Sequence, residues 1–365
     1  MTKTLFSSKR LMLTLMLCSC SVILLQNNNV SSENSFTVNI LCMLLGLSVC
    51  ALMIIPSVIL KKRYNTDVLT AVQSSPKWLK IVMSSVYALY FVYTAEHFLL
   101  PYTELFCVKY YPGVSPCVIG LCLLAACVYA AYKGTNIITR FGIFLFAFAL
   151  LTNGLMFFGS LSSLDFANNS LAPIYNFDSA AKTFIYFCTP SFIAAIYACT
   201  SAETDNFTLK QPFLALAFTG VKYALVMFFT AFAVGAYAQR QQYQSFILSR
   251  VAHFSAFGGI ESFFTALATM SVFMIISLFL SCVGRTTGKR SLKDIIVFAV
   301  IIFAGIFISE WNNSVKEIFT DDLILIIFTV IVAVLIPLAY ILKGGSKVET
   351  NRRNLTAADS VADGM

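Results

Sequence analysis

An acidic residue and a histidine stand side by side inside a long apolar run of the chain. Glu96 and His97 lie well within residues 81–106. Three tyrosines precede them at intervals of three residues: Tyr87, Tyr90 and Tyr93. Residues three apart lie along one face of a helix, and an ionisable group inside a membrane is costly and by default functional. The pattern predicts a polar wall on which Tyr93 and Glu96 bind a small molecule or shuttle protons. The alternative is that the carboxyl of Glu96 lies near the membrane surface or is paired within the protein.

Two other apolar runs carry small polar residues at places where a helix could open. Thr189, Pro190 and Ser191 stand in the middle of residues 183–200, and a proline removes a backbone donor and strains the preceding turn. The first run has a matching patch without glycine or proline: Cys18, Ser19, Cys20 and Ser21. Many secondary transporters bind substrate at broken helices near the membrane midplane, where backbone groups are free. We expect a ligand between these two segments, with a purely structural kink as the alternative.

Further residues are candidates for coupling or gating. His97 and Lys222 are ionisable groups within apolar runs, and Gly258 and Gly259 directly precede Glu261 at the start of another run. Paired glycines allow a close approach of helices or a local break. A gate at Glu261 and a solvated helix cap are both open interpretations.

The composition is typical of a membrane protein. Apolar residues make up 58% of the 365 residues and charged residues 12%, whereas a soluble domain carries about 25% charged residues. The eleven cysteines lie almost all within apolar runs, and the histidines are His97 and His253 alone, so we expect no metal site and no cofactor. No Walker loop, Gly-x-Ser-x-Gly or His-Glu-x-x-His motif is present, and we expect no enzymatic activity. The net charge of +8 is spread between the apolar runs, which argues against a nucleic-acid partner.

Ten apolar runs account for most of the chain, and most of them are long enough to cross about 30 Å of hydrocarbon. They cover residues 11–26, 38–60, 81–106, 115–132, 141–160, 183–200, 215–238, 261–283, 294–310 and 322–342. Each must be a helix, because the bilayer holds no water to satisfy an open backbone. The first run continues past Cys20, so we interpret it as a span rather than a signal peptide. Residues 242–253, between the seventh and eighth runs, are expected to form a short interfacial or re-entrant helix.

The basic residues alternate between the connections and so predict the orientation. Nineteen of the 25 fall on one side: Lys3, Lys9, Arg10, Lys61, Lys62, Arg63, Lys77, Lys80, Lys133, Arg140, Lys210, Arg285, Lys289, Arg290, Lys293, Lys343, Lys347, Arg352 and Arg353. Five fall on the other side: Lys109, Lys182, Arg240, Arg250 and Lys316. The remaining one, Lys222, belongs to the seventh run. Lysine and arginine concentrate in cytoplasmic loops, so both termini are predicted to be cytoplasmic. We predict an all-α integral membrane protein with a ten-helix domain, residues 1–342, and a disordered cytoplasmic tail, residues 343–365.

Two segments resemble one known family. Tyr132-Lys133-Gly134-Thr135-Asn136-Ile137-Ile138-Thr139-Arg140 resembles the Tyr-x-Gly-x-x-x-Ile-x-Arg type segment of the spore-germination permeases, the B subunits of bacterial germinant receptors. Arg250–Phe264, which includes Gly259, Ile260 and Glu261, resembles the approach to the eighth span in that family. The ten-helix layout, the cytoplasmic termini and the chain length also agree, so the resemblance extends to about residue 342.

The resemblance carries several expectations. The family is similar to the amino acid–polyamine–organocation transporters, which implies a five-plus-five inverted repeat with discontinuous helices 1 and 6. It also implies a small nutrient, often an amino acid, as ligand, and partner A and C subunits in the spore inner membrane. The small nutrient would lie between residues 18–21 and 189–191, beside Tyr93 and Glu96.

The chain departs from the family pattern at the expected ligand site. The first span lacks the usual glycine near its midpoint, Gly258 and Gly259 replace a charged pair, and Glu96 and His97 stand where many relatives carry an arginine. The identity of the ligand therefore does not transfer. Two other functions stay open: a proton-coupled amino-acid transporter that uses Glu96, His97 or Lys222, and a membrane scaffold that binds no ligand.

Overall fold

The protein is a bundle of membrane-spanning helices. The computed structural model describes residues 6–25, 35–166, 176–205, 210–235, 237, 243–254, 257–258, 260–286 and 291–342. Within these ranges, ten helical segments are long and apolar enough to cross a membrane, and each of the four strands has two residues. The predicted all-α membrane fold with ten spans is confirmed. The predicted tail, residues 343–365, and Gly259 lie outside the described residues.

Several of the ten spans are assembled from consecutive short helices. The first five spans are α1 (Ser8–Leu25), α2 (Phe36–Tyr64), α4 (Lys77–Lys109), α5 (Pro116–Lys133), and α6 (Thr135–Ser160) with the 3₁₀ turn η1 (Leu161–Ser163). The sixth span consists of α7 (Phe177–Cys188), the 3₁₀ turn η3 (Thr189–Ser191), α8 (Phe192–Thr200) and the 3₁₀ turn η4 (Ser201–Glu203). The seventh is α9 (Lys210–Phe229) with the π turn η5 (Thr230–Val234), the eighth α12 (Glu261–Thr286) and the ninth α13 (Leu292–Trp311). The tenth consists of α15 (Asp322–Val330), the π turn η6 (Ile331–Leu335) and α16 (Ile336–Leu342).

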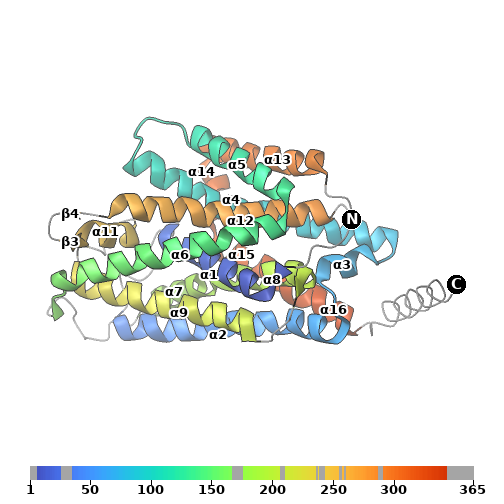
Figure 1. Cartoon of the computed structure of the whole chain (residues 1–365), viewed down its shortest axis with the longest axis horizontal. Helices are drawn as coiled ribbons and strands as arrows, with labels where there is room; N and C mark the ends of the chain where they lie inside the picture. The colour runs from blue at the N-terminus through green and yellow to red at the C-terminus, as the bar shows by residue number, and fades with distance from the viewer. Residues whose placement is uncertain are drawn as a thin grey trace.

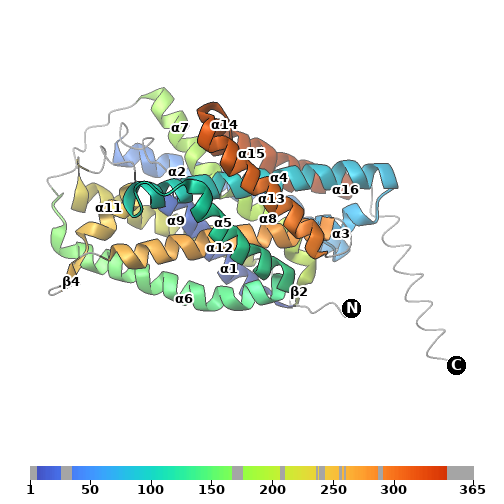
Figure 2. The same ribbon diagram turned by 90° about the horizontal axis from the view of Figure 1, so that it is seen from above.

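The remaining elements lie at the ends of the bundle or between spans. They are β1 (Phe6–Ser7), α3 (Val68–Gln73), β2 (Thr204–Asp205), α11 (Gln244–Val251), β3 (His253–Phe254), β4 (Phe257–Gly258) and α14 (Asn313–Thr320). Helix α11 confirms the short helix expected between the seventh and eighth spans. Figures 1 and 2 both place α3 at one end of the bundle and α11 at the other. We call the end with α3 the basic end, because it joins the connections that are rich in lysine and arginine, and the end with α11 the opposite end.

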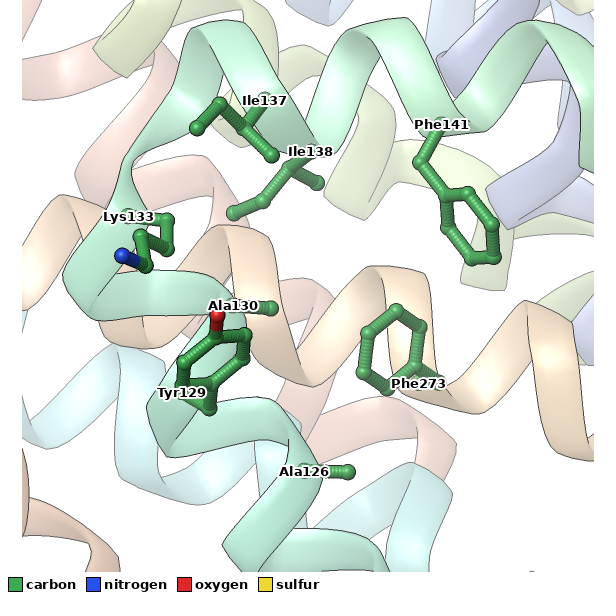
Figure 3. A pocket seen from close by; sticks show the side chains of 8 residues that line it. All are labelled: Ala126, Tyr129, Ala130, Lys133, Ile137, Ile138, Phe141 and Phe273. Atoms are coloured by element: carbon green, nitrogen blue, oxygen red, sulfur yellow. The ribbon is translucent and has the colours of Figure 1, made fainter.

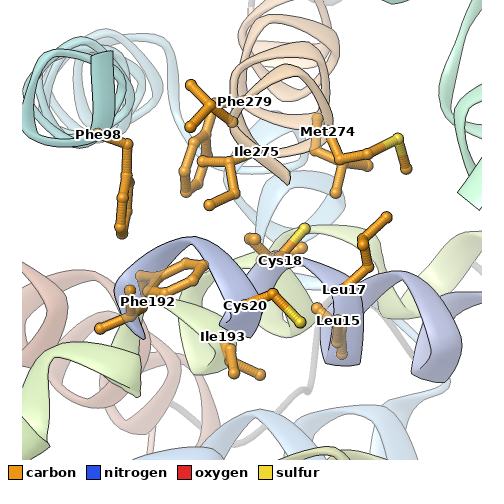
Figure 4. Packing of buried hydrophobic residues seen from close by; sticks show 14 of the residues in the cluster. Leu15, Leu17, Cys18, Cys20, Phe98, Phe192, Ile193, Met274, Ile275 and Phe279 are labelled. Atoms are coloured by element: carbon orange, nitrogen blue, oxygen red, sulfur yellow. The ribbon is translucent and has the colours of Figure 1, made fainter. Parts of the chain in front are cut away.

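Three spans form the centre of the bundle. We compared the buried share of the most apolar 18-residue stretch in each span. It is 78% in α1 and in α12 and 89% in the sixth span, against 28–50% in the other seven spans. In Figure 1, α1, α8 and α12 lie between α13 on one side and α2 on the other. Figure 4 shows Leu17 and Cys18 of α1 beneath Met274 and Ile275 of α12. The less buried spans form the outside, where a bilayer would surround them.

The first span is one unbroken helix, so the prediction of a discontinuous helix 1 is wrong. Its polar patch is satisfied within the helix: the Ser19 hydroxyl donates to the Met16 carbonyl at 2.7 Å, and the Ser21 hydroxyl to the Cys18 carbonyl at 2.7 Å. Such bonds to the preceding turn give a buried hydroxyl a partner without opening the backbone. Without glycine or proline, nothing in α1 forces a break.

The sixth span is interrupted at the predicted place, by a tightened turn. Residues Thr189–Ser191 form the 3₁₀ turn η3, and the backbone stays in the helical region, with φ −54° and ψ −36° at Thr189. A 3₁₀ stretch within a helix changes the hydrogen-bond pattern without unwinding it. The thiol of Cys50 in α2 donates to the carbonyl of Cys188 at 3.3 Å. The inverted repeat that would relate the first and sixth spans stays a prediction.

A single glycine makes the corner between the fourth and fifth spans. α5 ends at Lys133 and α6 begins at Thr135, with Gly134 at φ 100° between them. A side chain is strained at this angle, whereas glycine adopts it freely. The glycine of the Tyr-x-Gly segment therefore has a structural role: it lets the chain turn from α5 into α6 without a loop.

Helices α2 and α7 approach each other closely at Gly46, and this contact can be tested. A Cβ atom at Gly46 would lie 2.8 Å from the backbone carbon and the Cβ of Phe187, whereas a Cβ at Gly154 of α6 would have nothing within 4 Å. Overpacking of this kind costs about 1–3 kcal/mol. We expect Gly46→Ala to lower the melting temperature of the detergent-purified protein and Gly154→Ala to leave it unchanged or raise it. Equal melting temperatures for the two variants would contradict this packing.

Candidate functional site

The two segments expected to hold a ligand lie beside each other in the centre of the bundle. Helix α1 packs against η3, and the patches 18–21 and 189–191 are buried. Figure 4 shows Cys18 and Cys20 of α1 next to Phe192 and Ile193, which follow directly after η3. The structure therefore brings the two segments together at a closed site, which a ligand could reach only after the protein opens.

Two hydroxyls of the sixth span are buried without a hydrogen-bond partner. They are the Oγ of Ser191 in η3 and the phenolic oxygen of Tyr197 in α8. A buried polar group without a partner costs about 1–3 kcal/mol, and such a group requires an explanation. A polar ligand in this position would satisfy them. Ser191 was predicted from the sequence, whereas Tyr197 was missed because nothing distinguishes it from other aromatic residues in an apolar run.

The tyrosine stripe of α4 forms a ladder against the tenth span. The Tyr87 hydroxyl donates to the carbonyl of Val332 at 2.8 Å, and the Tyr90 hydroxyl lies 3.1 Å from the Thr329 hydroxyl. The Tyr93 hydroxyl lies 2.7 Å from the Ile318 carbonyl and 2.9 Å from the Asp321 carbonyl. Val332 belongs to the π turn η6. The stripe is thus a helix–helix interface, and Tyr93 already has partners at the junction of α14 and α15.

His97 holds the same junction. Its Nδ1 lies 3.1 Å from the carbonyl oxygen of Phe319, and its Nε2 lies 3.3 Å from a carboxylate oxygen of Asp322. A carbonyl can only accept, so Nδ1 must carry a hydrogen. His97 therefore joins the third span to the end of α14 and to the start of the tenth span.

Glu96 points away from this junction, toward α13. Its side chain is fully buried, and neither carboxyl oxygen has a hydrogen-bond partner. A Cβ atom at Gly305 would collide with the Oε1 of Glu96, so the glycine makes room for the carboxyl. Burying an ionised carboxylate without a partner is very costly. The position suits either a neutral acid or a group that awaits a partner of opposite charge.

Lys222 is the basic counterpart of Glu96. It lies on α9 with 3% of its side chain exposed, and its Nζ has no hydrogen-bond partner. No ion pair joins it to Glu96 among the residues that the structure describes. The two groups are buried separately, each available to a proton or a charged ligand.

The basic end is closed by a buried network around Arg285, the last-turn arginine of α12. One guanidinium nitrogen lies 2.5 Å from a carboxylate oxygen of Asp67, which is fully buried, and another donates to the carbonyl of Cys199. The Nε lies 3.5 Å from a carboxylate oxygen of Glu203 in η4. We call Asp67, Glu203 and Arg285 the latch. The latch ties the connection between the second and third spans to the ends of the sixth and eighth.

A short parallel pair of strands reinforces the latch. Phe6 pairs with Thr204 and Ser7 with Asp205, so the start of the first span is held beside the end of the sixth. Phe6 is 1% exposed. In Figure 2, β2 lies at the same end of the bundle as α3.

The opposite end is closed by an exposed ion pair and by buried contacts of α11. Arg250 of α11 and Glu261, the first residue of α12, form an ion pair at 2.9 Å, with 56% and 34% of their side chains exposed. The Ser245 hydroxyl donates to the Ile23 carbonyl at 2.9 Å, and the Tyr110 hydroxyl to the Glu261 carbonyl at 3.3 Å. Gly258 pairs with His253 in the small antiparallel sheet. Glu261 thus begins the eighth span as predicted and also has a partner on the short helix.

The two closures differ in strength. Breaking a buried ion pair by losing one partner costs about 3–5 kcal/mol, whereas an exposed pair contributes only about 0.2–1 kcal/mol. Within the latch the pair of Arg285 and Asp67 is the buried kind, and the pair of Arg250 and Glu261 is the exposed kind. The opposite end should therefore open more easily than the basic end.

These features define a polytopic α-helical membrane protein whose central helices are closed off at both ends. The chain belongs to the spore germination protein family, whose family model matches residues 7–318. The match covers the first nine spans and most of α14. No curated protein shows a significant match. The chain is a permease-like membrane protein of spore germination, and the family is one of transport or receptor proteins rather than enzymes.

The latch was not predicted from the sequence. Arg285 was counted only as an orientation signal, although Asp67 stands out as an acidic residue in a connection that carries five basic ones. Among the described residues, no group of three or more His, Cys, Asp or Glu side chains could hold a metal ion.

The anchoring role of Tyr93 can be separated from a ligand-binding role. Tyr93→Phe removes a buried hydroxyl that contacts two carbonyls, and a hydrogen bond of this kind contributes about 0.5–1.5 kcal/mol. We expect a lower melting temperature without any ligand present. Tyr111→Phe is the control, because Tyr111 is exposed. If Tyr93→Phe melts like the wild type and only weakens ligand binding, Tyr93 lines the ligand site instead.

Proposed function

We propose that the chain is the membrane-embedded nutrient-binding subunit of a spore germinant receptor. The match to the spore germination family supports this role, as do the ten spans and the central position of the two predicted segments. The basic end faces the cytoplasm, because lysine and arginine concentrate there. Both termini are then cytoplasmic, and the membrane is the inner membrane of the spore.

The proposed ligand is a small nutrient, most simply an amino acid, held between residues 18–21 and 189–191. The unpartnered Ser191 and Tyr197 hydroxyls can hydrogen-bond it. In the closed structure Glu96 points toward α13, so it would reach an ammonium group of the ligand only after the bundle rearranges. Tyr93 would position the third span by its bonds to the carbonyls of Ile318 and Asp321. His97, Lys222, Gly258, Gly259 and Glu261 would couple or gate the site.

The observation that carries this proposal is the unequal strength of the two closures. A nutrient from outside needs only the opposite end to open, where the ion pair of Arg250 and Glu261 is exposed. The buried latch keeps the basic end shut. Binding would then favour one conformation of the subunit, and the receptor's A and C subunits would sense the shift. A protein that opens on one side only senses its ligand without transporting it.

A proton-coupled amino-acid transporter is the second candidate. It is favoured by Glu96 and Lys222, whose charged groups are buried without hydrogen-bond partners. This candidate requires accumulation of the ligand in proteoliposomes and slower turnover after Glu96→Gln. A scaffold without a ligand is the third candidate and requires that no small molecule binds saturably.

Ser191 permits a clean test, because its hydroxyl has no partner to lose. We expect one class among amino acids, nucleosides and sugars to raise the melting temperature of the purified protein saturably, since a ligand stabilises the state it binds. Ser191→Ala should abolish this rise and leave the ligand-free melting temperature unchanged. Ser160→Ala, at the end of α6, should keep the rise.

The three candidates differ in the outcome. Saturable stabilisation without uptake into proteoliposomes supports the receptor subunit. Stabilisation with sustained uptake contradicts it in favour of the transporter. If no compound stabilises a well-folded sample, alone or with the A and C subunits, the result supports the scaffold that binds no ligand.

A further inference from the structure

An apolar groove opens on the outside of the bundle where the fourth and fifth spans meet the eighth. Its volume is about 260 Å³, and its lining comes from α5, α6 and α12. Figure 3 shows the side chains that form it, which besides two alanines of α5 are Tyr129, Lys133, Ile137, Ile138, Phe141 and Phe273. The corner at Gly134 brings the end of α5 and the start of α6 to the same rim.

The groove faces the surroundings of the bundle rather than its centre. Tyr129, Ile137 and Phe141 are all exposed, and they belong to spans that a bilayer surrounds. An apolar groove open to hydrocarbon is filled by hydrocarbon, since water has no hydrogen-bond partners there. The acyl chain of a lipid therefore fits this surface.

The rim carries one positive charge without an acidic partner. The Nζ of Lys133 lies 5.4 Å from the centre of the Tyr129 ring, and no ion pair to Lys133 is present in the described part of the chain. Residues 116–164 contain no Asp or Glu, whereas Arg140 adds a second cation on α6. The charge at the rim therefore favours an anion, and a basic residue near the membrane surface attracts anionic lipids.

We propose that this groove binds an anionic phospholipid of the leaflet at the basic end. One acyl chain lies along Ile138, Phe141 and Phe273, and the phosphate pairs with Lys133, whose stem and neighbouring Tyr129 ring lie at the membrane interface. Phe273 is on α12, next to Met274, which Figure 4 shows above Leu17 and Cys18 of α1. The lipid thus contacts the span that packs on the central polar patch. This site does not depend on the nutrient-binding role.

The test compares lipids that differ only in charge. The full-length protein in neutral detergent is titrated with phosphatidylglycerol and with phosphatidylcholine of the same acyl chains, and the melting temperature is followed. We expect saturable stabilisation with a preference of about fivefold for phosphatidylglycerol, the equivalent of about 1 kcal/mol. Lys133→Gln should remove the preference and leave the melting temperature in phosphatidylcholine unchanged. Lys62 is an exposed lysine at the same end, and Lys62→Gln should keep the preference for phosphatidylglycerol.

Two further measurements make the result decisive. Ala130→Trp fills the groove and should weaken the binding of both lipids. Soluble glycerol phosphate should not raise the melting temperature of the protein. Equal stabilisation by the two lipids, or a preference that survives Lys133→Gln, would overturn the proposal. Stabilisation by glycerol phosphate as strong as that by the lipid would show a plain anion site instead.

Discussion

The interior of this protein is governed by one constraint: inside a membrane, every polar group must find its partner in the protein. The serines of α1 bond to their own helix, and the tyrosines of α4 bond to the tenth span. The thiol of Cys50 bonds to the carbonyl at the interrupted sixth span. Several buried side-chain polar atoms nevertheless lack a hydrogen-bond partner, among them those of Thr152, Tyr223, Thr230 and Ser277. Of this set, Glu96, Lys222, Ser191 and Tyr197 are the residues at which we propose that a proton or a polar ligand completes the structure.

The same constraint explains why the two ends of the bundle differ. Asp67 of the latch is fully buried, so its charge is held by Arg285, and separating the two leaves a buried charge. The pair of Arg250 and Glu261 is exposed, so water compensates either partner when the pair breaks. A closed centre with one strong and one weak closure favours opening toward the side opposite the basic end. This asymmetry is what a sensing subunit needs and what a transporter must overcome in every cycle.

Much of the fold was predictable, because hydrophobic length and proline chemistry are local properties. The ten spans, the short helix before the eighth span, the start of that span at Glu261 and the interruption at Pro190 all follow from residues near one another in the chain. The partner of each polar side chain is a tertiary property. Periodicity showed that Tyr87, Tyr90 and Tyr93 share a face but not that the face packs on the tenth span, and composition could not pair Arg285 with Asp67. The first span was expected to be discontinuous because small polar residues interrupt its apolar run. Serine hydroxyls can, however, donate to backbone carbonyls of the preceding turn, so the helix stays continuous. The inverted repeat, the ligand residues and the tail stay predictions.

The central claim, that the opposite end opens more easily than the basic end, can be measured with cysteines the chain already has. Cys18 and Cys20 lie in the middle of α1 and are fully buried, so a membrane-impermeant thiol reagent reaches them only through an opening. The protein is reconstituted in one orientation, the reagent is added to either side, and mass spectrometry follows the modification of these two residues. The difference between a buried and an exposed closure predicts labelling at least about tenfold faster from the side opposite the basic end. Equal rates from both sides, or faster labelling from the basic end, would contradict the account.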